Sequence, residues 1–370
     1  MRKKILATIV LAMFLATVGG VSAQANWWDS DYQYRQQVTI ENNAGSVMES
    51  GYTVDADISD ITSPLASGDD IRVVYNDVEL DRLLDLDAGT VTFMTHANIA
   101  TWESDSDYYV YYGNPSAGAA PADGNNVYLF YDDFSGYSGT DDPNFLGVWE
   151  SFSTRGGAAI ENGMLRMWSS GPNPPAWQKW VTKEDFTKNI RAEFDLKYLG
   201  VQDYYHPRAI AAFIRAEHNF DHYGQAFPNF FIGCCSGGQT LLVGDSWLST
   251  GVYAYSDAFH TMTLSAFEDD VSLYRDGVHL GSVTASQYIR GGAFGVFAHG
   301  DSWGGDNVYF DNVKLSKYVS PEPTLSKGPE EVSTTGDANK GHGNDPDGVD
   351  EDNPGKGCEN KNANGNRKRC

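Results

Sequence analysis

The chain has 370 residues and carries 26 Lys and Arg against 50 Asp and Glu, which gives a formal net charge of −24. Outside the last few residues it has no basic stripe that displaces counterions from phosphate, so a nucleic-acid binder is excluded, and its acidity disfavours an anionic membrane surface. Its 9 Trp, 21 Tyr and 18 Phe exclude disorder throughout, and 39 Gly with many Tyr, Val and Thr favour strands and turns.

Residues 1–23 are organised like a secretory signal peptide. Basic residues at positions 2–4 precede an apolar stretch at 5–18, and Val21-Ser22-Ala23 fits the small-x-small pattern of signal peptidase. An uncleaved anchor is the alternative, but the apolar stretch is short for a bilayer. No later segment reaches the roughly eighteen apolar residues of a spanning helix. The sequence therefore predicts an extracellular or cell-surface protein with no membrane span.

Residues 24–117 read as a small β domain. Apolar and polar residues alternate from Tyr34 through Tyr112, with Asn, Asp, Gly and Pro between the runs, and period two predicts short antiparallel strands. Small residues dominate 118–126, which we interpret as a linker.

Residues 127–319 predict a second and larger β domain. The clearest strands are expected at 191–198, 209–215, 260–267, 271–275 and 309–315, and Asp276-Gly277 is a strong hairpin signal. Beyond Ser320 the chain is rich in Pro, Gly, Asp, Asn and Glu and has almost no large apolar residues. The sequence predicts that 320–370 form a disordered acidic tail, with a surface-tethering or sorting segment as the alternative.

The first domain resembles domain of unknown function 2341. The resemblance is carried by Trp27-Trp28-Asp29, the strand from Tyr34 to Ile40, and the stretch from Tyr108 to Pro115 with its Tyr-Tyr-Gly-Asn-Pro ending. It implies an extracellular module, commonly followed by a lectin-like sandwich, with no established activity.

The second domain resembles the concanavalin A-like lectin and glucanase superfamily, which includes laminin G-like domains. Phe130 to Phe134 looks like its opening strand, Leu273 to Gly277 like its late hairpin, and Tyr309 to Val313 like its closing strand. The resemblance implies a jelly roll of two curved antiparallel sheets whose concave face often binds carbohydrate. The fold alone does not choose among lectins, adhesion domains, glycosidases and lyases.

Catalytic candidates are weak. Glucanases of the superfamily place Glu-x-Asp-x-Glu on one strand so that the carboxylates share a face. Glu193 and Asp195 match two of these positions, but Lys197 or Tyr198 stands at the third, so the motif is incomplete. A lyase would use Tyr204, Tyr205, His206 and Arg208, although adjacency in one loop is poor evidence that these side chains converge.

Calcium is the one cofactor that the sequence predicts, and neither haem nor a nucleotide is expected. Related jelly rolls often tie the first strand to the last with Ca²⁺, and Asp132, Asp133 and Asp311 lie in the two terminal motifs. The alternative is that Asp132 and Asp311 cap strand ends. His218 and His222 have the spacing of half a zinc site only on a helix, and this region reads as strand and turn.

The cysteines and loop tryptophans supply the remaining candidates. Cys234 and Cys235 form either a vicinal disulfide, two thiols or bonds to the tail, while Cys358 and Cys370 pair with each other or link two molecules. Tryptophans outside clear strands predict platforms for stacking on sugars, with burial in the core as the alternative. The ligand-binding candidates are Trp177, Trp180, Tyr204, Tyr205, His206, Arg208, Trp247 and Trp303.

The leading interpretation is a secreted, non-catalytic, all-β protein whose second domain binds carbohydrate or another cell-surface polymer, in adhesion for example. The first alternative is a polysaccharide-degrading enzyme that acts on the concave face of the jelly roll. The second is a structural component of an extracellular layer or appendage, which self-associates through its first domain or through a disulfide in the tail.

Overall fold

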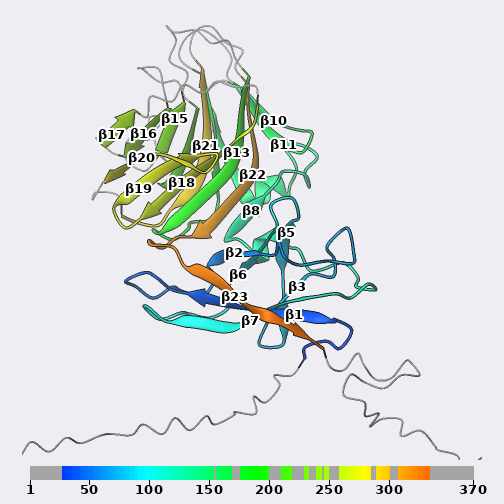
Figure 1. The fold of residues 1–370 in the computed structure, drawn as a ribbon. Coiled ribbons are helices and arrows are strands. Elements are labelled where there is room, and N and C mark those ends of the chain that lie inside the picture. The colour runs from blue at the N-terminus through cyan, green and yellow to red at the C-terminus, as the bar shows by residue number, and fades with distance from the viewer. Residues whose placement is uncertain are drawn as a thin grey trace, which may run out of the picture.

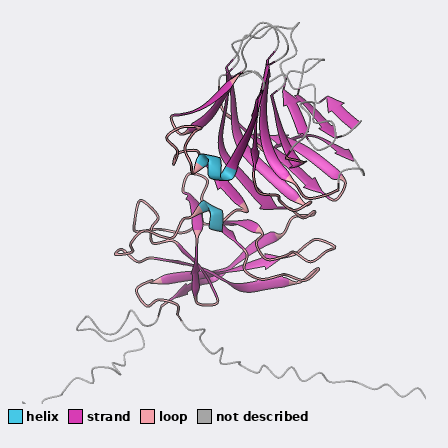
Figure 2. Ribbon diagram, turned by 180° about the vertical axis from the view of Figure 1, so that it is seen from behind, coloured by secondary structure: helices cyan, strands magenta, loops and turns pink. Residues whose placement is uncertain are grey.

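The structure is a computed structural model that describes residues 27–153, 156–168, 176–199, 210–218, 229–232, 239–243, 246–249, 258–284, 289–300 and 307–333. Strands dominate these residues and form two stacked domains (Figure 1). Within the described ranges, helix is confined to α1 (Phe145–Val148) and the 3-10 turn η1 (Gly124–Asn126), as Figure 2 shows. The prediction of an all-β chain with a small first domain and a larger sandwich is confirmed.

The N-terminal domain contains two sheets. Its five-stranded sheet has the order β23 (Thr324–Val332), β1 (Tyr34–Glu41), β7 (Ser104–Tyr112), β3 (Arg72–Tyr75) and β4 (Val78–Leu80). Its three-stranded sheet has the order β2 (Thr53–Asp57), β6 (Thr90–Met94) and β5 (Arg82–Asp85). Alternating residues such as Val38, Ile40, Val54 and Phe93 are buried in one core, which is the period-two pattern read from the sequence.

The C-terminal strand β23 corrects the predicted boundary of the tail. The sequence assigned 320–370 to a disordered segment, but Thr324–Val332 pair antiparallel with β1 and complete the N-terminal sheet. The prediction failed because this strand is short of apolar residues and contains Gly328 and Pro329, which indicate a turn. The larger domain is therefore inserted between β7 and β23 of the smaller one. Residues 334–370 lie outside the described ranges.

The C-terminal domain is a sandwich of two antiparallel sheets. The first sheet has the order β10 (Gly157–Glu161), β11 (Met164–Trp168), β22 (Asn307–Lys317), β13 (Ile190–Leu199), β18 (His260–Phe267), β19 (Asp270–Arg275) and β20 (Val278–Thr284), with β8 (Phe130–Asp132) also paired to β22. The second has the order β17 (Ser246–Ser249), β16 (Gln239–Val243), β15 (Asn229–Ile232), β14 (Ile210–Ala216), β21 (Ala293–Gly300), β12 (Ala176–Thr182) and β9 (Trp149–Ser153).

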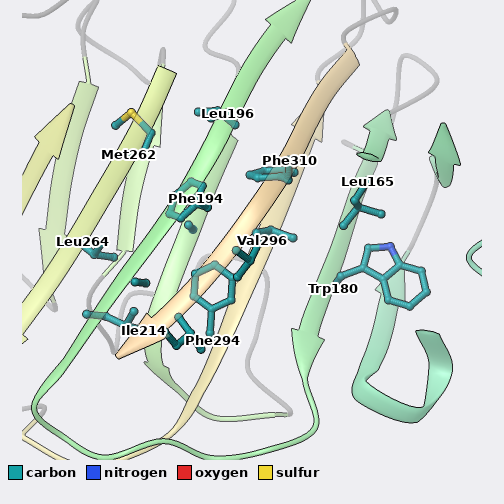
Figure 3. Packing of buried hydrophobic residues seen from close by; sticks show 14 of the residues in the cluster. Leu165, Trp180, Phe194, Leu196, Ile214, Met262, Leu264, Phe294, Val296 and Phe310 are labelled. Atoms are coloured by element: carbon teal, nitrogen blue, oxygen red, sulfur yellow. The ribbon is translucent and has the colours of Figure 1, made fainter. Parts of the chain in front are cut away.

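The core of the sandwich lies between these sheets, and Figure 3 shows Phe194 and Phe310 of one sheet facing Phe294 and Val296 of the other. Strand β13 explains how the sequence sets this arrangement, because each apolar residue alternates with a polar residue that points away from the core. The hairpin at Asp276-Gly277 is confirmed, since both residues have positive φ, 49° and 74°, as a two-residue hairpin turn requires.

Polar contacts fix the two domains against each other. Arg191 of the sandwich donates two hydrogen bonds to Glu322, one of them 2.9 Å long, and stacks over Tyr318 at 4.9 Å. The Lys317 ammonium donates to the Ser50 carbonyl at 2.7 Å, and Thr53 donates to the Val127 carbonyl at 2.7 Å. These bonds lie beside both chain crossings and join the two domains across their contact.

Candidate functional site

A groove of about 890 Å³ lies where the three-stranded sheet of the N-terminal domain meets the first sheet of the sandwich. Residues of β2, β5 and β6 line one side, and residues of β8, β13 and β22 line the other. Figure 1 shows β2, β5, β6 and β8 where the two domains meet. Neither domain forms it alone.

Two tyrosines form an aromatic wall in this groove. The rings of Tyr128 and Tyr131 are stacked, with centroids 6.0 Å apart and planes inclined by 16°, and both side chains are half-buried. Gly124 makes room for the wall, because a Cβ there would lie 2.2 Å from the Tyr131 ring. Burial, together with the nearby charges of Asp55 and Glu193, raises the pKa of Tyr128, so its hydroxyl remains a hydrogen-bond donor at neutral pH.

The N-terminal side of the groove is rich in carboxylates. Asp55 accepts a 2.5 Å hydrogen bond from the Thr92 hydroxyl across β2 and β6, and Asp85 and Asp87 follow at the end of β5. Arg82 also lines the groove, but it is buried and donates to the carbonyls of Ile71 and Gly68 at 3.0 and 2.8 Å. This side therefore presents mainly hydrogen-bond acceptors.

The sandwich side presents an ammonium, a carboxylate and an amide. The Lys314 ammonium lies 3.1 Å from Glu193 and 5.9 Å from the centre of the Tyr128 ring. Asn312 donates from its side chain to Asp195 at 2.9 Å, and Asp195 also accepts from Thr261 at 2.7 Å. A bulge in β22 places Asn312 at this edge, since Asn312 has φ of 49° and the register with β13 shifts between Glu193 and Asp195.

Asp311 lies next to this network, and the pKa of its carboxyl is raised. It pairs with Asp195 across β22 and β13. Burial, reinforced by the charges of Asp195 and Asp133 and opposed by a hydrogen bond from the Asn312 backbone, raises the pKa of Asp311 to about 6. The sequence singled out Glu193 with Asp195, but the structure ties Glu193 to Lys314 and places Asp311 opposite Asp195. The bulge that brings Asp311 and Asn312 there has no clear signal in the sequence.

The other predicted metal ligands have hydrogen-bonding roles. Asp132 accepts from the Phe134 amide, the Tyr137 hydroxyl and the Trp149 indole, at 2.8, 3.1 and 2.7 Å. Asp133 accepts from the amide and hydroxyl of Ser135. Among the described residues, no group of three or more His, Cys, Asp or Glu side chains is arranged to hold a metal ion. The calcium site thus stays a prediction.

Trp180 is not an exposed platform, which corrects one predicted binding residue. It is only 4% exposed and belongs to the core cluster drawn in Figure 3. Its ring packs edge-on against Phe145 with ring centroids 4.8 Å apart. Strand β12 puts Trp180 on the core face and Lys179 on the other. The centre of that other face is not open either, because Lys179, Phe213 and Phe297 are at most 2% exposed.

For the remaining candidate binding residues, the structure describes no side chain. The backbones of Trp177 and Trp247 belong to β12 and β17, whereas Tyr204, Tyr205, His206, Arg208 and Trp303 lie outside the described residues. The same is true of residues 1–23 and of Cys234, Cys235, Cys358 and Cys370.

His218 does not show the geometry of half a zinc site. Its two ring nitrogens lie 2.6 Å from Glu150 and 3.1 Å from Asp185, on opposite sides of the ring, and these carboxylates raise its pKa against the effect of burial. His222 lies outside the described residues. In the described part of the chain, no helix is long and apolar enough to cross a membrane.

A family model described as a domain of unknown function, DUF2341, matches residues 67–151. The predicted resemblance to this family is confirmed for residues 67–117, which include the stretch from Tyr108 to Pro115, whereas the motifs at Trp27 and Tyr34 lie outside the match. The match covers less than half of the chain and extends through the predicted linker into β9 of the sandwich. None of the curated proteins matches the chain.

Several solved structures are similar to this chain at 12% sequence identity. They include the metal-free carbohydrate recognition domain of Emp46p, with a TM-score of 0.39, covering 50% of this chain and 95% of that one. A protein of unknown function with a galectin-like fold from Bacillus subtilis has a TM-score of 0.37, with coverages of 51% and 96%. The carbohydrate-binding module CBM66 from Bacillus subtilis has a TM-score of 0.33, with coverages of 45% and 95%. Such low scores say nothing about the ligand of this chain, and they leave a concanavalin A-like assignment unconfirmed.

Proposed function

We propose that the groove between the domains binds a neutral carbohydrate polymer. The observation that carries this proposal is the stacked pair Tyr128 and Tyr131, which stands in a groove otherwise lined by carboxylates, hydroxyls, an amide and an ammonium. Sugars expose both C–H faces, which pack on aromatic rings, and hydroxyls, which pair with fixed donors and acceptors.

The charge of the groove favours a neutral or amine-bearing sugar over a uronate or sulfated one. Glu193 is paired with Lys314, and the three carboxylates of Asp55, Asp85 and Asp87 outweigh the single positive charge of Arg82, so the local potential is negative. The net charge of the whole chain, −24, has the same sign. An anionic polymer approaching this surface meets repulsion from both.

Replacing one ring of the aromatic wall tests this function. Tyr131→Ala should weaken binding of a neutral oligosaccharide about tenfold, which corresponds to about 1.4 kcal/mol of lost packing. The matched control is Trp102→Ala, since Trp102 is 67% exposed on the N-terminal domain and does not line the groove. A glycan array selects the ligand and titration calorimetry measures the affinity. Equal losses for the two variants, or binding only to uronate polymers, would contradict the proposal.

A second candidate is polysaccharide hydrolysis at Asp311 and Asp195, beside the same groove. A carboxyl whose pKa is raised to about 6, facing a second carboxylate, is the arrangement that supports general acid and base catalysis. Asp311→Asn should then abolish release of reducing ends while leaving binding intact. If the wild-type protein binds the polymer and releases no reducing ends, the candidate is wrong.

We also propose that the protein is secreted and that attachment to an extracellular polymer is its role, on the strength of the signal-like pattern in 1–23 and the groove. A structural Ca²⁺ near Asp311 remains part of this proposal, supported by the mutual repulsion of Asp311, Asp195 and Asp133, which a bound cation would relieve.

A further inference from the structure

Strand β23 follows β22 of the sandwich and returns the chain to the N-terminal domain. It pairs with β1 from Tyr34↔Val332 to Glu41↔Thr324, and the register shifts between Gln36 and Val38. It is the outermost strand of its sheet, and β1 is its only partner within that sheet (Figure 1). Removal of β23 would therefore leave β1 with a free edge of backbone donors and acceptors.

Polar interactions along the whole strand hold β23 in place. Lys327 forms ion pairs with Asp60 and, at 3.8 Å, with Asp57. Glu330 accepts a 2.5 Å hydrogen bond from the Tyr112 hydroxyl, and Glu331 accepts from Arg35 at 2.8 and 2.7 Å. At its start, the Thr324 hydroxyl lies 3.1 Å from the Asn43 amide.

Apolar burial contributes little to this attachment. Leu325 is the one side chain of the strand that packs against the N-terminal core, and it is only partly buried. Val332 is exposed, whereas Val38 and Ile40 of β1 are fully buried. A strand with little buried apolar surface at the edge of a sheet opens at a lower free energy than the sheet as a whole.

We propose that β23 is exchangeable and that the β1 edge of one molecule binds β23 of a second copy of this chain. A second copy offers the same Lys327, Glu330 and Glu331 in the same register, so the ion pairs and hydrogen bonds that form within one molecule form equally well between two. Association then depends on concentration and on the ease of release. The exchanged segment begins at Pro323, because hydrogen bonds from Arg191 and Asn43 hold Glu322 on the rest of the molecule.

A pair of charge-reversal variants tests this exchange in the full chain. Lys327→Glu places a carboxylate on β23 against Asp57 and Asp60, and Asp60→Lys places an ammonium against Lys327, so each variant alone is repelled within its own chain. When the two are mixed, β23 of each copy finds an opposite charge on the other. We expect the mixture to shift to a heterodimer in native mass spectrometry of differently tagged copies, while each variant alone and the chain with both changes stay monomeric.

The matched control uses an exposed ion pair away from β23. Lys188 and Glu268 lie 2.6 Å apart within the sandwich, and mixing Lys188→Glu with Glu268→Lys should give monomers only. A heterodimer in this control would overturn the proposal, since it would reflect general attraction between surfaces. The proposal is also wrong if the first mixture stays monomeric while the chain with both changes regains the melting temperature that each single change loses.

Discussion

The environment of Asp311 differs from the one that its position in the sequence indicates. The motif Tyr309 to Val313 predicted a closing strand in which Asp311 either binds calcium or caps the strand, and the structure puts Asp311 at a bulge opposite Asp195. The spacing along the chain could not show this, because the bulge is set by the pairing of β22 with β13, which are more than a hundred residues apart in the sequence.

The raised pKa of Asp311 makes stability depend on pH. Its folded pKa of about 6 lies above the ordinary value of 3.8, so the protonated form favours folding. The contribution is fully present below about pH 4 and is lost as the pH rises through about 6. Asp311→Asn should remove this dependence and, because the site is half exposed, raise the free energy of unfolding at pH 7 by about 1 to 2 kcal/mol.

Melting temperatures of the wild type and Asp311→Asn between pH 4 and 7 check this expectation. A parallel series with calcium and with a chelator tests the structural ion, which should raise the melting temperature of the wild type alone. If the two proteins keep the same pH profile, the proposed interaction between Asp311 and Asp195 is wrong.

Trp180 and Tyr131 show why aromatic residues are hard to assign to a core or a site. Both stand in strands beside segments rich in turn residues, and only the strand register decides which ring is covered. Trp180 falls on the core face of β12. Tyr131 falls on the outer face of β8, where the neighbouring domain leaves a groove. The sequence predicted platforms at tryptophans outside clear strands, Trp180 among them, whereas the ring that lines the groove is that of Tyr131.

At the scale of elements, local sequence patterns were sufficient to predict a strand wherever its side chains alternate between a core face and a solvent face. Strands β1, β13, β18 and β19 follow the expected ranges closely, and so does the hairpin at Asp276. Strand β23 could not be predicted, because it is an edge strand held by ion pairs and hydrogen bonds between side chains. Its Gly328-Pro329 also indicates a turn.

Truncation tests the contribution of β23 to the N-terminal domain. A chain ending at Pro323 loses the packing of Leu325 and leaves buried Arg35 without Glu331, so the free energy of unfolding should fall by about 3 kcal/mol. A chain ending at Ser333 keeps the strand and serves as the control. Urea unfolding measures both, and equal stability of the two chains would contradict the structural role of β23.

At the scale of the whole molecule, the groove depends on the insertion of one domain into the other. Two chain crossings and the bonds of Lys317, Arg191 and Thr53 set the small sheet against the sandwich. No local pattern contains this arrangement, since Asp55, Tyr131 and Lys314 come from three distant parts of the sequence. The β fold could be predicted from the alternating pattern, and polymer binding was expected from the resemblance of the second domain, but neither gave the location of the groove.

Hydrogen–deuterium exchange with a bound neutral oligosaccharide tests most directly whether both domains form the binding site. The ligand should slow exchange together in peptides covering residues 83–92 of the N-terminal domain and 312–314 of the sandwich, because both sides line the groove. Slower exchange confined to the sandwich sheet that contains β12, β14 and β21, with residues 83–92 unchanged, would contradict a site shared between the domains.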